Sequence, residues 1–364
     1  MNTVFPIGFP APTALYLTLF VTTLLLHVVF MNYVLAGTAF LALAGLVKRK
    51  PADTGNATIS SILRDWMPFA VSAAITMGVA PILFVQILYK ENFYTANLLL
   101  FHRWMSIVPV LIVGFYLTYL LKSNKLATGQ FALRIVVGFG AAACFGFTAL
   151  SWTENHLLSL DRAVWTDMYA KGDIFYRSRV ILPRLAMWFC GAFPTLATLV
   201  AWQLFSTQKN APEPQRQRSA RHIALIAAIG LTAFVASAIV YFWMMPPESR
   251  HAAIGPMSKP YLFVAGCGVV IQLAAWHLVF HRRRLTCVLL QLASFGALGT
   301  ILGTLIARES IRISAIDFER LYSQHADAAT KGGLLVFVAF AVVNAAAIAW
   351  CFRLVRRGRV RQLD

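Results

Sequence analysis

Two polar side chains interrupt an apolar stretch near the N-terminus, and one of them is a histidine. The sequence LLLHVVFMNYVLAG, from Leu24 to Gly37, places His27 and Asn32 among aliphatic and aromatic residues. Hydrocarbon offers no hydrogen-bond partner, so an imidazole or an amide there must find one within the protein. His27 therefore has three interpretations: a hydrogen bond that fixes helix packing, ligation of haem iron, or a hydrogen bond to a quinone carbonyl.

A second group of reactive residue types collects where apolar runs end. Its members are Gln86, Tyr89, Glu91, Tyr94, His102, Arg103, Glu154, His156, Arg308 and Glu309. Oxidation of a quinol needs a carboxylate or a histidine that accepts protons, in a pocket that is otherwise apolar and aromatic. Glu154 and His156 fit that role by type and depth, and Gln86 and Arg308 could complete a quinone pocket. The alternative is that all of these residues are solvated at the membrane surface.

The remaining histidines and the cysteines suggest no metal centre. His277 and His281 share one helical face and could ligate a metal or haem, but they directly precede Arg282 to Arg284 and fit a basic interface more simply. The five cysteines are single, without CxxC or CxxCH, which argues against zinc ribbons, iron–sulfur clusters and covalent haem c. Paired histidines on two helices, as in a diheme cytochrome b, are not visible in the sequence.

The composition predicts the kind of fold that holds these residues in place. Of the 364 residues, 59% are hydrophobic and 13% are charged, against about 25% charged in soluble proteins. The formal net charge of +18 comes from short basic clusters between apolar runs, which is how topology signals are spaced. We therefore expect an all-α, polytopic membrane helix bundle whose surroundings are lipid and not nucleic acid.

About 20 apolar residues make one crossing, which predicts about nine transmembrane helices. Their expected ranges are 14–47, 66–89, 97–121, 131–152, 180–205, 222–244, 261–281, 285–307 and 333–354. The excess of Lys and Arg in the loops after the odd-numbered helices predicts an outside N-terminus and a cytoplasmic C-terminus. A basic, Pro-bearing linker at 208–221 would separate a five-helix part, 1–207, from a four-helix part, 222–364.

Four motifs carry a resemblance to a known family. They are FPAP near the N-terminus, LLLHVVFMNYVLAG, GVAPILFVQILYKENFYT and LPRLAMWF. With them the chain resembles, over most of its length, bacterial inner-membrane proteins of a cytochrome b-like family. That family is distantly related to subunit I of cytochrome bd quinol oxidase, and its members often accompany multihaem c-type cytochromes.

The resemblance implies roles for three residues. His27 matches the histidine of the family's first span, and Arg184 matches the arginine of its fifth-span motif. Where that motif commonly has a histidine three residues after the arginine, this chain has Met187. This implies either a mixed haem b site formed by His27 and Met187, or loss of the haem in a structural or quinone-binding anchor. The chain also lacks the GRQPW motif and the long quinol loop, which argues against oxygen reduction.

Together these observations favour a subunit of a respiratory electron-transfer complex in the bacterial inner membrane. It would exchange electrons between the quinone pool and a periplasmic redox partner, a c-type cytochrome, as part of a quinol:acceptor oxidoreductase. Two alternatives remain: a haem-free membrane anchor of a redox complex, and a transporter, for which Pro81, Pro109 and Pro194 could break helices.

Overall fold

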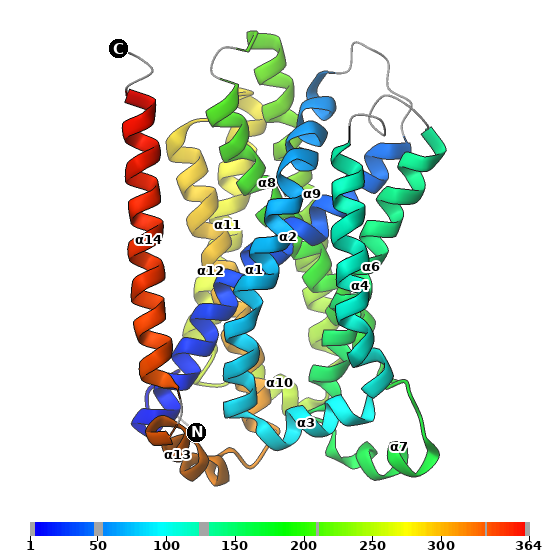
Figure 1. Ribbon diagram of the computed structural model, residues 1–364, viewed down its shortest axis with the longest axis vertical. Coiled ribbons are helices and arrows are strands. Elements are labelled where there is room, and N and C mark those ends of the chain that lie inside the picture. Colours follow the sequence, from blue (N-terminus) through cyan, green and yellow to red (C-terminus); the bar gives the residue numbers. More distant parts are fainter. Residues whose placement is uncertain (1–3, 47–53, 124–130, 209–210, 332, 361–364) are drawn as a thin grey trace.

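The chain folds into a bundle of long helices with a few short helices at one end (Figure 1). The computed structural model describes residues 4–46, 54–123, 131–208, 211–331 and 333–360, and these ranges contain helices and no strand. The helices are α1 (Ala11–Leu46), α2 (Thr54–Leu88), α3 (Lys90–Leu99), α4 (Phe101–Lys122), α6 (Phe131–Leu158), η1 (Arg162–Val164), α7 (Trp165–Lys171), α8 (Ile181–Thr207), α9 (Glu213–Met244), α10 (Pro247–Ala253), α11 (Lys259–Arg282), α12 (Cys287–Ser314), η2 (Phe318–Leu321), α13 (Tyr322–Lys331) and α14 (Leu334–Val360).

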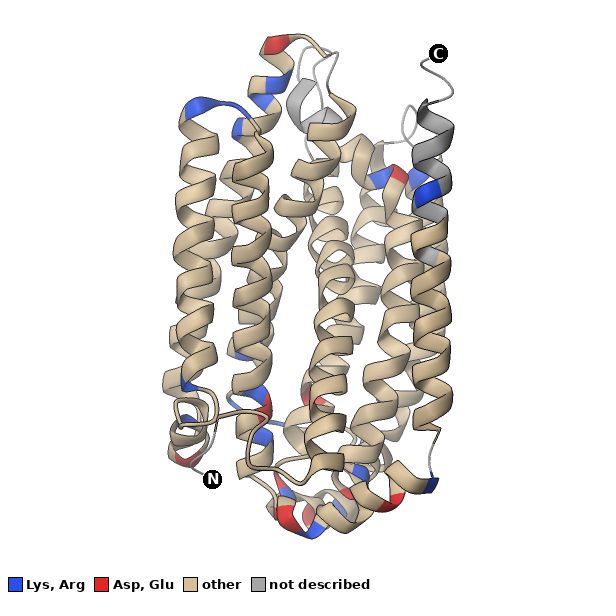
Figure 2. Ribbon diagram, turned by 90° about the vertical axis from the view of Figure 1, so that its left-hand side faces the viewer, with Lys and Arg blue, Asp and Glu red and all other residues tan. Residues whose placement is uncertain are grey.

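Eight of the described helices are long and apolar enough to cross a membrane. A ninth crossing results if the segments 318–331 and 334–347, which meet at a bend of 62°, are taken as one broken span. Large apolar side chains on the outer faces of the long helices are more than half exposed, among them Leu83, Val108, Ile229, Phe263 and Phe295. Figure 2 shows the charged residues gathered towards the two ends of the bundle, with an almost uncharged band between them. The predicted all-α, multi-pass membrane protein is confirmed.

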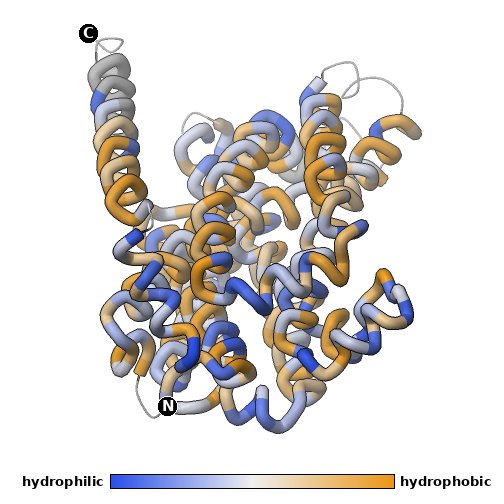
Figure 3. Tube along the Cα trace, turned by 60° about the horizontal axis from the view of Figure 1, so that its bottom comes forward, coloured by the Kyte–Doolittle hydropathy of each residue, from blue (hydrophilic) through white to orange (hydrophobic). Residues whose placement is uncertain are grey.

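Neighbouring long helices run antiparallel and pack in pairs. α1 lies along α2, α8 along α9, and α11 along α12, as expected where a short connection joins two spans. The short helices α3, α7, α10 and α13 lie at the end of the bundle where α1 begins, and α14 runs to the opposite end (Figure 1). Figure 3 views the bundle with that first end brought forward, and shows the polar residues of the short helices and the apolar residues of the long ones. The inside–outside orientation stays a prediction.

Several helix boundaries differ from those expected. α6 continues to Leu158 and α12 to Ser314, so segments expected as outer loops are helical. The reason is that the polar residues following each apolar run are buried and have partners within the bundle. α2 begins at Thr54, earlier than expected, and α9 begins at Glu213, so 213–221 of the expected linker is helical. Residues 209–210 lie outside the described ranges, and the division into two parts stays a prediction.

Glycines bring α11 and α12 into backbone contact. A Cβ on Gly268 would lie 2.5 Å from the carbonyl oxygen of Gly296, and a Cβ on Gly296 would lie 2.7 Å from the carbonyl oxygen of Gly268. Real side chains do not tolerate such distances, so only glycine permits this approach. The close contact holds α12 against α11, and α12 carries the buried charged residues Glu309 and Arg312.

Candidate functional site

The last two turns of α12 carry a buried ionic cluster. The Glu309 side chain is fully buried, and its Oε1 accepts hydrogen bonds from Nε and Nη2 of Arg308 at 3.0 and 2.9 Å. Arg312 lies about one turn further and donates from Nη1 to Oε2 at 3.3 Å. The hydroxyl of Tyr89, which follows α2, donates to the same Oε2 at 2.9 Å. One carboxylate therefore binds two guanidinium groups and a phenol.

His156 of α6 joins this cluster through Arg312. Nη2 of Arg312 lies 3.0 Å from Nδ1 of His156. A guanidinium group can only donate, so Nδ1 must be the acceptor and the proton of the neutral imidazole must be on Nε2. That Nε2–H group is buried and has no partner among the described residues, and the same is true of Nε of Arg312. Both of these donors belong to the same cluster of side chains.

The cluster contains more positive than negative charge. Arg184 of α8 is buried, hydrogen-bonded to Tyr241, and close enough to Arg312 and Glu309 for their charges to interact. Three arginines therefore share one glutamate. The Arg312 guanidinium also lies 4.5 Å from the ring centroid of Tyr89, a cation–π contact. Buried charge is costly unless it is compensated, so a further group with negative or partial negative charge would be stabilised beside these arginines.

Glu154 belongs to a different pair, although it is only two residues from His156. Its carboxylate binds the guanidinium of Arg103 on α4, and both side chains are largely buried. Arg103 also lies 5.0 Å from the ring centroid of Phe175. Residues at i and i+2 project from different faces of a helix, so the structure separates two residues that we expected to act together.

His27 packs against α2. Its Nδ1 lies 2.9 Å from the carbonyl oxygen of Ala74, and because a carbonyl only accepts, Nδ1 carries the proton and Nε2 carries the lone pair. A Cβ on Gly78 would lie 3.0 Å from Cε1 of His27, so glycine makes room for the ring. A histidine whose Nδ1–H donates to a backbone carbonyl has the arrangement typical of metal-ligating histidines.

The other expected site residues are more dispersed. Met187 of α8 is buried in an apolar cluster with Leu158, Phe234 and Tyr241, and it makes no described contact with His27. Gln86 is half-buried on α2, three residues before Tyr89, and its side chain has no hydrogen bond to a described residue. Of the expected pocket residues, the structure brings together His156 and Arg308, through Arg312 and Glu309.

Arg312 is the residue of the cluster that the sequence analysis missed. The expected end of the eighth span at residue 307 placed the sequence RESIRIS, residues 308–314, outside the membrane, where arginines need no partner. The available signal was the spacing of Arg308 and Arg312, four residues apart with Glu309 between them, which puts all three near one helical face.

Comparisons with known proteins address the fold. No family model and no curated protein matches the chain. Among solved structures, the chain is similar to one in the structure of bd oxidase from Geobacillus thermodenitrificans, with a TM-score of 0.67 and 13% sequence identity. The similarity covers 97% of this chain and 99% of that one. The fold expected from the resemblance is thus supported, and the chain is a multi-pass membrane protein with that architecture.

Proposed function

We propose that this protein is a membrane subunit of a respiratory electron-transfer complex in the bacterial inner membrane. It exchanges electrons between the quinone pool and a periplasmic redox partner of the c-type cytochrome class. The observation that carries this proposal is the buried cluster around Glu309, in which His156 Nε2–H and Arg312 Nε–H are donors without partners. The similarity of fold to a bd oxidase supports the same class of function.

The cluster suits the polar head of a quinone. A quinone presents carbonyl oxygens, and the two unpartnered donors are groups that such oxygens accept from. Aromatic residues border the cluster, since the Arg312 guanidinium lies 5.9 Å from the ring centroid of Phe20 on α1 and 4.5 Å from that of Tyr89. When the quinol is oxidised it must release protons, and we assign Glu154, which is two residues from His156 and is paired with Arg103, to accept them.

His27 fits the role of a haem b ligand by its hydrogen bonding. Its Nδ1–H is held by the carbonyl of Ala74, which leaves Nε2 to hold the iron, and Arg308 is close enough for its charge to interact with the ring. Bound haem b would supply a one-electron carrier between the quinone and the external partner. Met187 is the residue we propose as second ligand, on the basis of its place in the LPRLAMWF motif.

The spectrum and the quinone content of the purified protein test this proposal. We expect a haem b band in the reduced-minus-oxidised spectrum and a quinone in an organic extract. His27→Ala should abolish the band, and Gly78→Ala should shift it, because the added methyl group displaces the imidazole. His156→Phe should lower the quinone content and leave the haem band in place.

His251→Ala is the matched control. His251 is exposed, and its Nδ1 lies 2.9 Å from the carbonyl oxygen of Pro247 on its own helix, so haem and quinone contents should equal those of the wild type. A wild-type protein with neither haem b nor quinone would refute the proposal. Quinone without haem, lost in His156→Phe, would instead identify a haem-free, quinone-binding anchor.

A further inference from the structure

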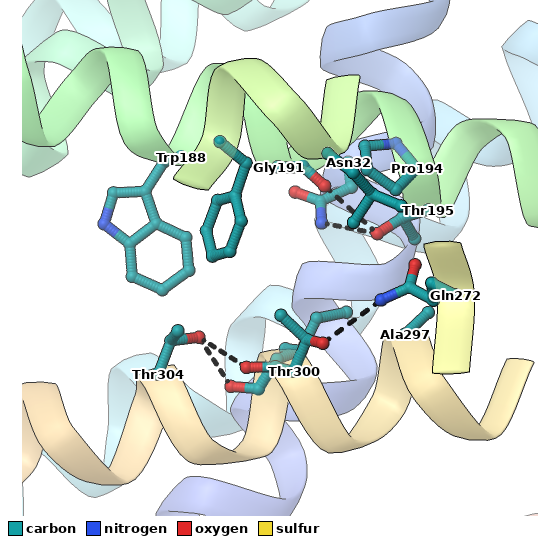
Figure 4. Close-up of a pocket in the computed structure, with 12 residues that line it drawn as sticks. Asn32, Trp188, Gly191, Pro194, Thr195, Gln272, Ala297, Thr300 and Thr304 are labelled. Carbon is teal, nitrogen blue, oxygen red and sulfur yellow. Dashed lines mark hydrogen bonds between the residues drawn. The ribbon is translucent and has the colours of Figure 1, made fainter. Parts of the chain in front are cut away.

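A small cavity lies between α1, α8, α9, α11 and α12, within the membrane-spanning part of the bundle and apart from the ionic cluster. Its polar lining comes from four helices: Asn32 of α1, Thr195 of α8, Gln272 of α11, and Thr300 and Thr304 of α12. Figure 4 shows the side chains of Asn32 and Thr195 on one side of the cavity and those of Gln272 and Thr300 on the other. The rest of the lining is apolar, and includes Trp188, Leu231, Phe234 and Ile301.

Most polar side chains around this cavity are hydrogen-bonded to one another or to their own helix. The amide nitrogen of Asn32 donates to Oγ1 of Thr195 at 3.1 Å, and that of Gln272 donates to Oγ1 of Thr300 at 3.1 Å. The hydroxyl of Thr195 donates to a backbone carbonyl of its own helix, as do those of Thr300 and Thr304. The three hydroxyl groups and the amide nitrogen of Gln272 are thus occupied as donors.

Two acceptors of the lining have no partner among the described residues. They are Oδ1 of Asn32 and Oε1 of Gln272, on side chains that are 2% and 1% exposed. An amide oxygen in hydrocarbon without a hydrogen bond is strongly disfavoured, and the two oxygens belong to helices on either side of one cavity. A ligand that donates two hydrogen bonds would satisfy both.

We propose that this cavity binds a water molecule that donates one hydrogen bond to Asn32 Oδ1 and one to Gln272 Oε1. The free volume is about 20 Å³, and about 10–15 Å³ by the same measure holds one water. An organic ring is too large for this space. The water bridges α1 to α11, and so joins the segment before residue 208 to the segment after it.

A monovalent cation is the other ligand that acceptors alone would attract, and the charge distribution disfavours it. Thr304 lies one turn before Arg308 on α12, and the three arginines of the cluster are compensated by Glu309 alone. No Asp or Glu lines the cavity. Repulsion by the excess positive charge acts on a cation and spares a neutral water.

Two measurements on the full chain test the inference. The first is a density map of the wild-type protein in a lipid nanodisc at a resolution that shows ordered water. We expect a peak within about 2.7–3.2 Å of both Asn32 Oδ1 and Gln272 Oε1. The second is a double-mutant cycle of Asn32→Leu and Gln272→Leu on the unfolding equilibrium. The two side chains share no direct hydrogen bond, so a bridging water predicts non-additive effects, with a coupling of about twofold or more in the unfolding constant.

The control cycle combines Asn32→Leu with Asn344→Leu. Asn344 is exposed on α14 and donates to the carbonyl oxygen of Phe340 on its own helix, so these effects should add. The inference is overturned if the map shows no peak between the two amides or if the Asn32–Gln272 cycle is additive. It is also overturned, in favour of a cation, if sodium chloride raises the wild-type Tm above that in choline chloride at equal ionic strength and Gln272→Leu removes this difference.

Discussion

Neutralising Glu309 is the change whose effect on the free energy of unfolding can be worked out best from the structure. In Glu309→Gln the carboxylate that binds Arg308 and Arg312 loses its charge, while the volume of the side chain is nearly unchanged. The Arg308 side chain is 20% exposed, so water can compensate part of its charge, whereas that of Arg312 is 7% exposed and cannot be rehydrated in place. Tyr89 also loses an ionised acceptor.

Breaking a buried pair by removing one partner costs about 3–5 kcal/mol. We expect Glu309→Gln to lower the free energy of unfolding by an amount near the lower end of this range, because Arg308 is partly solvated. Reversible unfolding of the purified protein in mixed detergent micelles measures this change. The double variant Glu309→Gln/Arg312→Met should recover part of the loss, since it removes the charge left without a partner.

Asp317→Asn is the matched control, because Asp317 pairs with Arg320 at the surface, where the two side chains are 51% and 84% exposed. Exposed pairs contribute little to stability, so this variant should unfold like the wild type. If Glu309→Gln were no less stable than Asp317→Asn, the conclusion that Glu309 compensates buried charge would be refuted.

Two further predictions concern stability. Gly268→Ala should destabilise the protein by about 1–3 kcal/mol, because its Cβ would lie 2.5 Å from the carbonyl oxygen of Gly296. Gly266→Ala is the control, since a Cβ there, on the same helix, would have nothing within 4 Å and should leave the stability unchanged. Equal effects of the two variants in the same unfolding assay would contradict the close contact. Burial raises the pKa of Tyr176, and the Asp161 carboxylate that accepts its hydrogen bond at 2.9 Å adds to the rise. Folding therefore favours the protonated phenol, so the free energy of unfolding should fall as the pH rises above the ordinary pKa of 10.0. Unfolding measured against pH should show a smaller alkaline decrease in Tyr176→Phe, and identical profiles would contradict this.

The sequence was sufficient to predict the membrane helices, because an apolar run is a local property. It was not sufficient to predict where α6 and α12 end. Glu154 and Glu309 follow apolar runs and resemble loop residues, but each is held within a helix by a partner distant in sequence, Arg103 or Tyr89. Only the packing of the helices brings such partners together.

In the candidate site, too, some features could be predicted from the local sequence and others depend on how the helices pack. His27 and Asn32 could be identified because a polar group in an apolar run needs a partner whatever the fold. The partners themselves could not be predicted: His27 binds a backbone carbonyl of α2, which has no sequence signature, and Asn32 binds Thr195. Gln272 stands in the apolar run VVIQLAAW and so gave the same signal, but only the packing of the helices shows that it lines the same cavity as Asn32.

The glycine contact between α11 and α12 also has a mechanical consequence. Two helices whose backbones touch at Gly268 and Gly296 cannot slide along one another without a steric clash. Gln272 lies on one helix of this pair, and Glu309 lies on the other. A rigid-body tilt of the pair would therefore displace the cavity and the ionic cluster together.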